Sequence, residues 1–324
     1  MSARRGVLLA AGALMIAPRG VAQQTRVWRI GLLGATSEAA VATRLGALRR
    51  GLSELGYVEG RNIAIEARWA QGQYERLPEL ASELVRQRVD VIVTYGTPGA
   101  SAAKRATATI PIVMATSGDA VATGLVASFA RPGGNLTGSS FHNPELAAKG
   151  VELLKAAAPR TTQIAVLLKR GNPINPHILA AIRDTARALQ LKMGAFEVTG
   201  VDDLPSAFEA MAAAHADAVV VHEDPLLNAN VNAIAPLATR HRLPSAGFVE
   251  FADAGGLIGY GVDFPAMWHR AASFVDKILK GAHPRDIPVE QPAKFEVVVN
   301  LAVARALGIK VPVAVLQRAD RVIE

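Results

Sequence analysis

The stretch that decides the fold runs from Val89 to Ser140 and reads VDVIVTYGTPGASAAKRATATIPIVMATSGDAVATGLVASFARPGGNLTGSS. It predicts three parallel strands, because short apolar runs bounded by Gly, Ser, Thr and Pro are typical of strands buried on both faces. In an open parallel sheet, the loops at the carboxyl ends of the strands form the ligand crevice. Thr97 and residues 117–119 fall at such ends, where we expect helix N-termini to offer free backbone N–H groups.

The same alternation of strands and helices occurs twice along the chain. The strand starts in the first half match those in the second half in order and rough spacing; they lie near Arg29, Asn62 and Asp90, and near Gln163, Lys192 and Asp217. A β-α-β-α-β unit that occurs twice predicts an α/β protein with two doubly wound parallel-sheet lobes, not one long sheet.

Composition excludes several classes of protein. The 324 residues include no Cys, which rules out disulfide scaffolds, thiolate zinc sites, iron–sulfur clusters and a Cys nucleophile. The formal charge is +7, but three arginines lie in residues 1–22, and without them 32 basic residues face 28 acidic ones. No basic run is interleaved with aromatic residues, so we expect no binding to nucleic acid.

The N-terminus has the pattern of a cleaved export signal. Arg4 and Arg5 precede a short apolar run at residues 6–17, and small residues precede a cleavage point near Ala22. The run is too short to span a bilayer. We therefore expect residues 1–22 to be a signal peptide and the rest to be a periplasmic protein. A chain without Cys offers no site for a lipid anchor, and the arginine pair leaves the Sec and twin-arginine export routes open.

Five segments, in a fixed order, resemble a known family. They are RIGLLG (29–34), GLSELGYVEGRNIAIEARWAQGQYERLPELASELV (51–85), VDVIVTYGTP (89–98), IPIVMATSGDAVATGLVASFARPGGNLTG (110–138) and ILKGAHPRDIPVEQPAKFEVVVNLAVARALGIKVP (278–312). They are similar to the ABC-transporter substrate-binding proteins that include tryptophan-binding lipoproteins. The resemblance covers nearly the whole mature chain. The chain departs from the lipoproteins in lacking the cysteine that would carry the lipid.

The resemblance implies the type I periplasmic binding protein fold, in which three crossovers join two lobes that hold the ligand between them. One lobe would comprise residues 26–141 and 255–283, and the other residues 142–254 and 284–324. The family also implies an ABC permease in the inner membrane as a partner. We expect a monomer that binds one small molecule.

The candidate ligand-binding residues are the polar groups at the strand ends. They are Thr36, Ser37, Gly96, Thr97, Ser117, Gly118 and Asp119 in the first lobe, and Asn172, Asn175, Glu223, Asp224 and Glu250 in the second. Tyr260 joins them on a strand expected to return to the first lobe. Hydroxyls and helix-start N–H groups suit a ligand carboxylate, and Asp119 or Glu223 suits an amino group. The same residue types also cap helices and turns, so we expect about half of them to do only that.

The sequence favours binding over catalysis. His222, Glu223 and Asp224 are possible metal ligands, but no second motif with ligand spacing accompanies them. The motifs of α/β-hydrolases, zinc proteases, NTPases and dinucleotide-binding enzymes do not occur. We therefore expect no enzyme activity, metal or cofactor.

The function that fits is a periplasmic receptor that closes about a hinge on an amino acid, aromatic or branched, or on a similar carboxylate. Two alternatives remain open. A ligand-sensing module of a regulator would carry a DNA-binding helix-turn-helix where this chain has an export signal. An enzyme on the same scaffold would turn its ligand over.

Overall fold

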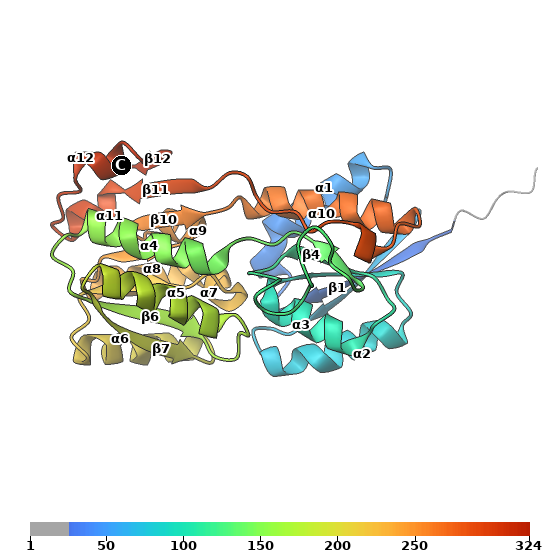
Figure 1. Ribbon diagram of the computed structural model, residues 1–324, viewed down its shortest axis with the longest axis horizontal. Coiled ribbons are helices and arrows are strands. Elements are labelled where there is room, and N and C mark those ends of the chain that lie inside the picture. Colours follow the sequence, from blue (N-terminus) through green and yellow to red (C-terminus); the bar gives the residue numbers. More distant parts are fainter. Residues whose placement is uncertain (1–25) are drawn as a thin grey trace, which may run out of the picture.

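The computed structural model describes residues 26–324 as two α/β lobes that lie side by side (Figure 1). The predicted signal peptide, residues 1–22, lies outside the described residues. Each lobe has its own sheet and its own buried apolar clusters, as the repeated strand–helix pattern predicts. Among residues 26–324, we find no helix with the length and apolarity that a membrane span requires.

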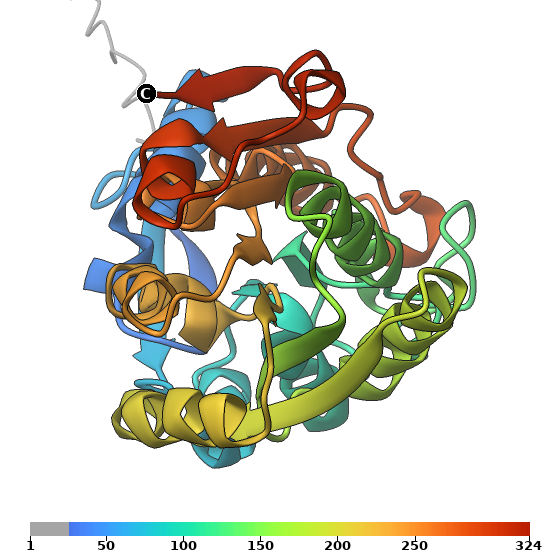
Figure 2. The same cartoon turned by 90° about the vertical axis from the view of Figure 1, so that its left-hand side faces the viewer.

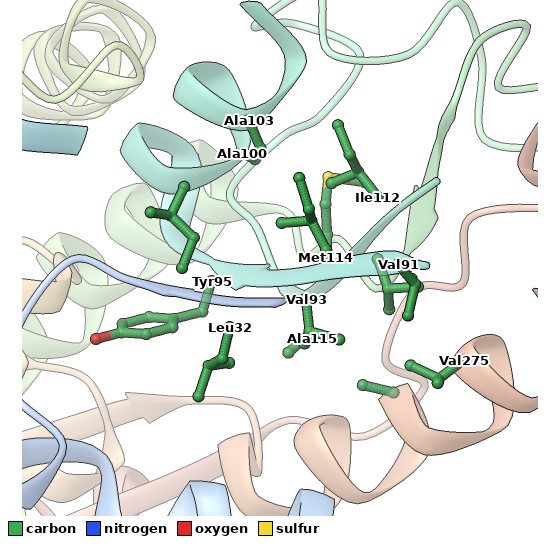
Figure 3. Packing of buried hydrophobic residues seen from close by; sticks show 14 of the residues in the cluster. Leu32, Val91, Val93, Tyr95, Ala100, Ala103, Ile112, Met114, Ala115 and Val275 are labelled. Carbon is green, nitrogen blue, oxygen red and sulfur yellow. The ribbon is translucent and has the colours of Figure 1, made fainter. Parts of the chain in front are cut away.

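The first lobe is built on a five-stranded parallel sheet in the order β2-β1-β3-β4-β5. Its strands are β1 (Trp28–Gly34), β2 (Ile63–Trp69), β3 (Val91–Tyr95), β4 (Ile112–Thr116) and β5 (Leu136–Gly138). Its helices are α1 (Ala42–Glu54), α2 (Leu77–Arg86), α3 (Gly96–Ala106) and α10 (Phe264–Leu279), with 3₁₀ turns η1 (Ala39–Val41), η2 (Tyr74–Arg76) and η4 (Pro284–Asp286). Figure 3 shows β3 in the centre of this core, with Ala100 and Ala103 of α3 on one side and Val275 of α10 on the other.

The second lobe is built on a seven-stranded sheet in the order β12-β11-β10-β9-β8-β6-β7. Its strands are β6 (Gln163–Lys169), β7 (Lys192–Val198), β8 (Ala218–Val221), β9 (Ser245–Gly247), β10 (Ile258–Gly261), β11 (Glu296–Asn300) and β12 (Arg321–Ile323). Only the β10–β11 pair is antiparallel among the pairings of residues 26–324. Seen from this lobe's end, the C-terminal segment, drawn in red, lies along one edge of the molecule (Figure 2).

Two apolar layers cover the faces of the second sheet. The helices of this lobe are α4 (Asn143–Ala157), α5 (Asn175–Ala188), α6 (Leu204–Ala213), α7 (Pro225–Ala229), α8 (Val231–Arg240), α9 (Val249–Asp253), α11 (Leu301–Ala306) and α12 (Val313–Leu316), with the 3₁₀ turn η3 (Val201–Asp203). Helices α4, α5, α11 and α12 contribute to one layer, and α6, α8 and α9 to the other.

Three crossovers join the lobes, at residues 139–142, 262–263 and 287–295. The first and third are tied together, because the Ser140 N–H donates to the Glu290 carbonyl at 2.9 Å. The first and second meet where the rings of Phe141 and Phe264 pack edge to face, with centroids 5.7 Å apart. All three crossovers therefore lie next to one another.

The structure corrects the predicted place of Tyr260. Its strand, β10, does not return to the first lobe, because Gly259 pairs with Gly247 of β9 and with Val298 of β11 in the second sheet. The chain changes lobe only after Gly261. Residues 255–261, which were expected in the first lobe, therefore belong to the second lobe. At the other end, Ile287 and Val289 pack in the first lobe's apolar cluster, beyond the expected boundary at 283.

Candidate functional site

The first lobe's strand ends are largely satisfied by their own neighbours. Tyr95, the last residue of β3, receives the Thr36 backbone N–H at 3.0 Å and lies 2.7 Å from the Thr36 hydroxyl. Its ring packs on Trp268 of α10, with centroids 5.0 Å apart. The Ser37 hydroxyl accepts the Ala40 N–H at 3.3 Å, a local hydrogen bond at the start of the turn η1. These groups hold the rim of the lobe in place.

The loop after β4 is a turn and not the helix N-terminus that the sequence suggested. The Asp119 carboxylate accepts the N–H groups of Val121 and Ala122 at 3.0 and 2.9 Å, and the segment continues as turns. Ser117 differs, because its side chain is fully buried and its hydroxyl has no hydrogen-bond partner among residues 26–324. A buried hydroxyl without a partner costs about 1–3 kcal/mol, so Ser117 marks a position where a polar partner would be favourable.

Asp224, which follows β8, is the best-bonded carboxylate of the second lobe. It caps α7 by accepting the Leu226 and Leu227 N–H groups at 2.8 and 3.3 Å. It also accepts the Asn172 amide at 2.8 Å and, from the first lobe, the Tyr74 hydroxyl at 2.7 Å. Burial raises the pKa of both Asp224 and Tyr74. Asp224 therefore works as a structural junction between the lobes.

Glu223, one residue earlier, has a different environment. Its carboxylate accepts no hydrogen bond from residues 26–324, although its backbone carbonyl accepts the Asn143 amide at 3.4 Å. Burial raises the pKa of Glu223 to about 8; Arg44 opposes that shift, and the neighbouring Asp224 and Glu250 reinforce it. A carboxylate so placed gains most from a positively charged partner.

Arg44 reaches across the cleft from α1 of the first lobe. Its guanidinium donates to the Asn228 side-chain carbonyl at 2.6 Å and pairs with Glu250 at 3.0 Å, both in the second lobe. It also lies 4.5 Å from the centre of the Phe264 ring. Together with the Tyr74–Asp224 bond, these contacts hold the two lobes directly against each other in this structure.

Several buried polar atoms of the second lobe in the same region have no hydrogen-bond partner among the residues that the structure describes, 26–324. They are both ring nitrogens of His222, the side-chain carbonyl of Asn175, the amide of Asn228 and one carboxylate oxygen of Glu250. Burial lowers the pKa of His222 to about 3, so its imidazole is neutral near pH 7. Each of these residues follows β6, β8 or β9, at the carboxyl ends of the strands.

A small cavity of about 30 Å³ lies where these strand ends meet the crossovers. Phe141, Phe248 and Phe264 form apolar walls, and Asn143, Glu223 and Tyr260 also border it. Its volume in the closed arrangement suits one or two water-sized groups, such as the polar tip of a ligand. Aromatic walls around a carboxylate are the surroundings that favour an ammonium group.

The comparisons with known proteins agree on one family. The model of the family described as "ABC transporter substrate binding protein" matches residues 29–323. This chain belongs to that family. A curated relative, the tyrosine-binding protein of Clostridioides difficile strain R20291, is 26% identical over 262 residues, which cover 81% of this chain and 75% of the relative.

Two solved structures share both sequence and fold with this substrate-binding protein. The ABC domain from Streptococcus pneumonia, solved in complex with L-Trp, is 27% identical with a TM-score of 0.82, over 91% of this chain and all of that chain. A conserved domain protein from Vibrio cholerae O1 biovar El Tor strain N16961 is also 27% identical, with a TM-score of 0.83, over 92% of this chain and 99% of that one. The predicted family and the predicted two-lobed α/β fold are confirmed.

The structure spreads the thirteen predicted site residues of this substrate-binding protein along the cleft. Only Glu223 and Tyr260 border the cavity. Asn172 and Asp224 bond to each other, and Glu250 pairs with Arg44. Gly96 lies against Pro225 of the opposite lobe, and Thr97 lies beside Gly118. Ser37 and Asp119 accept local backbone N–H groups.

Three residues that make contacts between the lobes of this substrate-binding protein were not among the predicted site residues. Arg44, Tyr74 and Asn228 lie in α1, η2 and α7, and polar residues of helical segments usually face solvent. Their partners lie 150 or more residues away in sequence, so no local pattern reveals them. Among residues 26–324, no group of three His, Cys, Asp or Glu side chains is placed to hold a metal ion.

Proposed function

We propose that this chain is the solute-binding component of an ABC importer and that its ligand is a small molecule with an ammonium group, most simply an amino acid with an apolar or aromatic side chain. The observation that carries this proposal is Glu223, an unbonded carboxylate at an aromatic-walled cavity. A ligand ammonium would supply the charge-assisted partner that Glu223 lacks.

The charges around the cleft support a cationic group on the ligand. Three carboxylates, those of Glu223, Asp224 and Glu250, gather at the second lobe's rim. Arg44 pairs with Glu250, and Asp224 is satisfied by neutral donors, which leaves Glu223 for the ligand. The relatives agree with this chemistry, since the names of two of them refer to tyrosine and L-Trp, both of which carry an α-ammonium group.

The ligand's carboxylate would meet polar groups of both lobes. The unpartnered Ser117 hydroxyl is the first-lobe donor, beside the predicted contacts Thr97 and Gly118. Across the cleft, the unpartnered Asn228 amide is a further donor. A ligand that bridges both lobes stabilises the closed state by contacts it cannot make when the lobes are apart.

Hinge motion about the three crossovers would admit the ligand. A cavity of about 30 Å³ is smaller than an amino acid, so the lobes must part and the walls at Phe141 and Phe264 must move with the crossovers. The closed, loaded receptor would then dock on an inner-membrane permease. This role requires export to the periplasm, which the predicted signal peptide would provide.

The test is a set of matched ligands against the exported chain, washed in mild denaturant and refolded to remove any retained ligand. We expect L-Tyr, L-Trp or L-Leu to raise the thermal midpoint and 3-(4-hydroxyphenyl)propanoate, which is tyrosine without its amino group, to have little effect. Equal binding of that desamino compound would refute the ammonium proposal. Turnover of a ligand would instead establish an enzyme.

A further inference from the structure

A short segment of the second lobe is inserted into the first lobe. It comprises Pro225 and Leu226, at the start of α7, and we call these two residues the plug. Figure 1 shows α7 on the side of the second lobe that faces the first. Leu226 is 8% exposed and packs in the apolar cluster of the first lobe. The next residue, Leu227, is 1% exposed and packs in a cluster of the second lobe.

Two glycines of the first lobe make room for the plug. A Cβ on Gly72 would lie 2.7 Å from Leu226 Cδ1, and a Cβ on Gly96 would lie 2.5 Å from Pro225 Cγ. At Gly96 the added atom would meet the rigid Pro225 ring, so the lobes approach this closely only with glycine there. At Gly72 the tip of the Leu226 side chain would have to move. Both glycines also have positive φ angles, +82° and +70°, which L-residues rarely adopt.

Hydrogen bonds fix the plug in this orientation. The Asp224 carboxylate accepts the Leu226 N–H at 2.8 Å and the Tyr74 hydroxyl at 2.7 Å. The Leu226 N–H also lies 3.2 Å from the Tyr74 hydroxyl oxygen. Tyr74 belongs to the first lobe, so parting the lobes would expose Leu226 and break this bond at the same time. Neither plug residue borders the cavity.

We propose that Leu226 is a positioning residue that sets the affinity of this receptor for every ligand by stabilising the closed arrangement of the lobes. This inference rests on the proposed function, because it assumes that the ligand binds between the lobes. A side chain that moves from an apolar core into water on opening favours closure in the absence of ligand. Ligand affinity then scales with the fraction of molecules in the closed state.

The first test measures closure without any ligand. The chain has no Cys, so Glu79→Cys on α2 and Glu209→Cys on α6, both exposed, would carry the only two spin labels. We expect one short interlobe distance in the parent and an added longer distance in Leu226→Ala. Leu227→Ala is the matched control, because it makes the same truncation in the next residue but inside one lobe. It should lower the thermal midpoint and leave the distance unchanged.

The second test measures binding. Leu226→Ala should weaken all ligands by a common factor, equal to the fall in the closed fraction that the distance measurement gives, while association becomes faster because the cleft is open more often. Damage to the ligand contacts would not speed association. Tyr74→Phe, which removes the two cross-lobe hydrogen bonds of the Tyr74 hydroxyl, should shift both quantities in the same direction by less.

The outcomes separate this inference from the proposed function. A parent protein that is open without ligand, or equal distance distributions in Leu226→Ala and Leu227→Ala, would overturn the role of the plug. A loss of affinity confined to one ligand would overturn it as well. If no amino acid binds but Leu226→Ala still opens the lobes, the plug stands and the proposed ligand class fails.

Discussion

The two rims of the cleft differ in how completely their polar groups are satisfied. In the first lobe, Thr36 bonds to Tyr95, and Asp119 closes its own turn. In the second lobe, His222 and Glu250 keep unpartnered buried atoms, and the Glu223 carboxylate accepts no hydrogen bond from residues 26–324. Buried polar groups are normally hydrogen-bonded, and exceptions call for an explanation.

The difference indicates a division of labour between the lobes. A satisfied rim is rigid and neutral towards a ligand, whereas an unsatisfied, charged rim selects for the group that would complete it. We therefore assign ligand selection mainly to the second lobe. The first lobe contributes closure, through Arg44 and the glycines that receive the plug. Within the described part of the chain, Ser117 is the one exception on the first-lobe rim.

Among the substitutions that test this difference between the lobes, Glu223→Gln should cause the largest loss of ligand affinity. The substitution keeps the size of the side chain and removes its charge, so an ammonium ligand should bind about 10- to 100-fold more weakly, as expected for a hydrogen bond to a charged group. Calorimetry with L-Tyr measures the loss. The desamino analogue provides the control, and a similar weakening of that compound would show that the change had disturbed the cavity and not the charge.

The pH dependence of binding should be the next largest effect. Because burial raises the pKa of Glu223 to about 8, its carboxyl is mostly neutral below that pH and must lose a proton to pair with an ammonium. Affinity should therefore rise with pH, by about tenfold from pH 6 to pH 7, and level off near pH 8. His222 does not titrate in this range, since its pKa is lowered to about 3. In Glu223→Gln the slope should disappear; a slope that persists would assign it to Asp224, whose pKa is also raised by burial.

The sequence predicts the positions of the strand ends better than it predicts the side-chain contacts between the two lobes. Buried strands followed by small and polar residues locate the strand ends, because that pattern is local. Arg44 and Glu250 are 206 residues apart, and nothing near Arg44 distinguishes it from a solvent-facing helix residue. The adjacent Leu226 and Leu227 look alike in sequence, yet they pack in different lobes.

The strand of Tyr260 shows the same limit at the level of topology. The run GGLIGYGVDF at residues 255–264 predicts a strand, and β10 confirms it over Ile258–Gly261. The run contains no information on which of two similar sheets receives it. In the structure β10 pairs with β9 and β11, and the chain crosses at residues 262–263 only afterwards, before α10 packs on α1.

The smallest expected effects come from two matched substitutions on the first-lobe rim, Ser117→Ala and Asp119→Ala. One should change ligand affinity without changing stability, and the other should change stability without changing affinity. Ser117→Ala removes a buried hydroxyl without a partner, so it should weaken an amino-acid ligand about fivefold, the value of one hydrogen bond, with no loss of stability. Asp119→Ala removes a carboxylate that holds a turn through two backbone N–H groups. It should lower the free energy of unfolding by about 1 kcal/mol and leave affinity unchanged.

Urea unfolding and calorimetry on both variants separate the two roles. If Asp119→Ala weakened binding more than Ser117→Ala, the Asp119 carboxylate would belong to the ligand and not to its turn. The first-lobe rim would then share in charge selection, and the contrast between the lobes would be one of degree. If Ser117→Ala changed neither quantity, the ligand would engage the first lobe only through backbone groups, and the second lobe would hold every selective side chain.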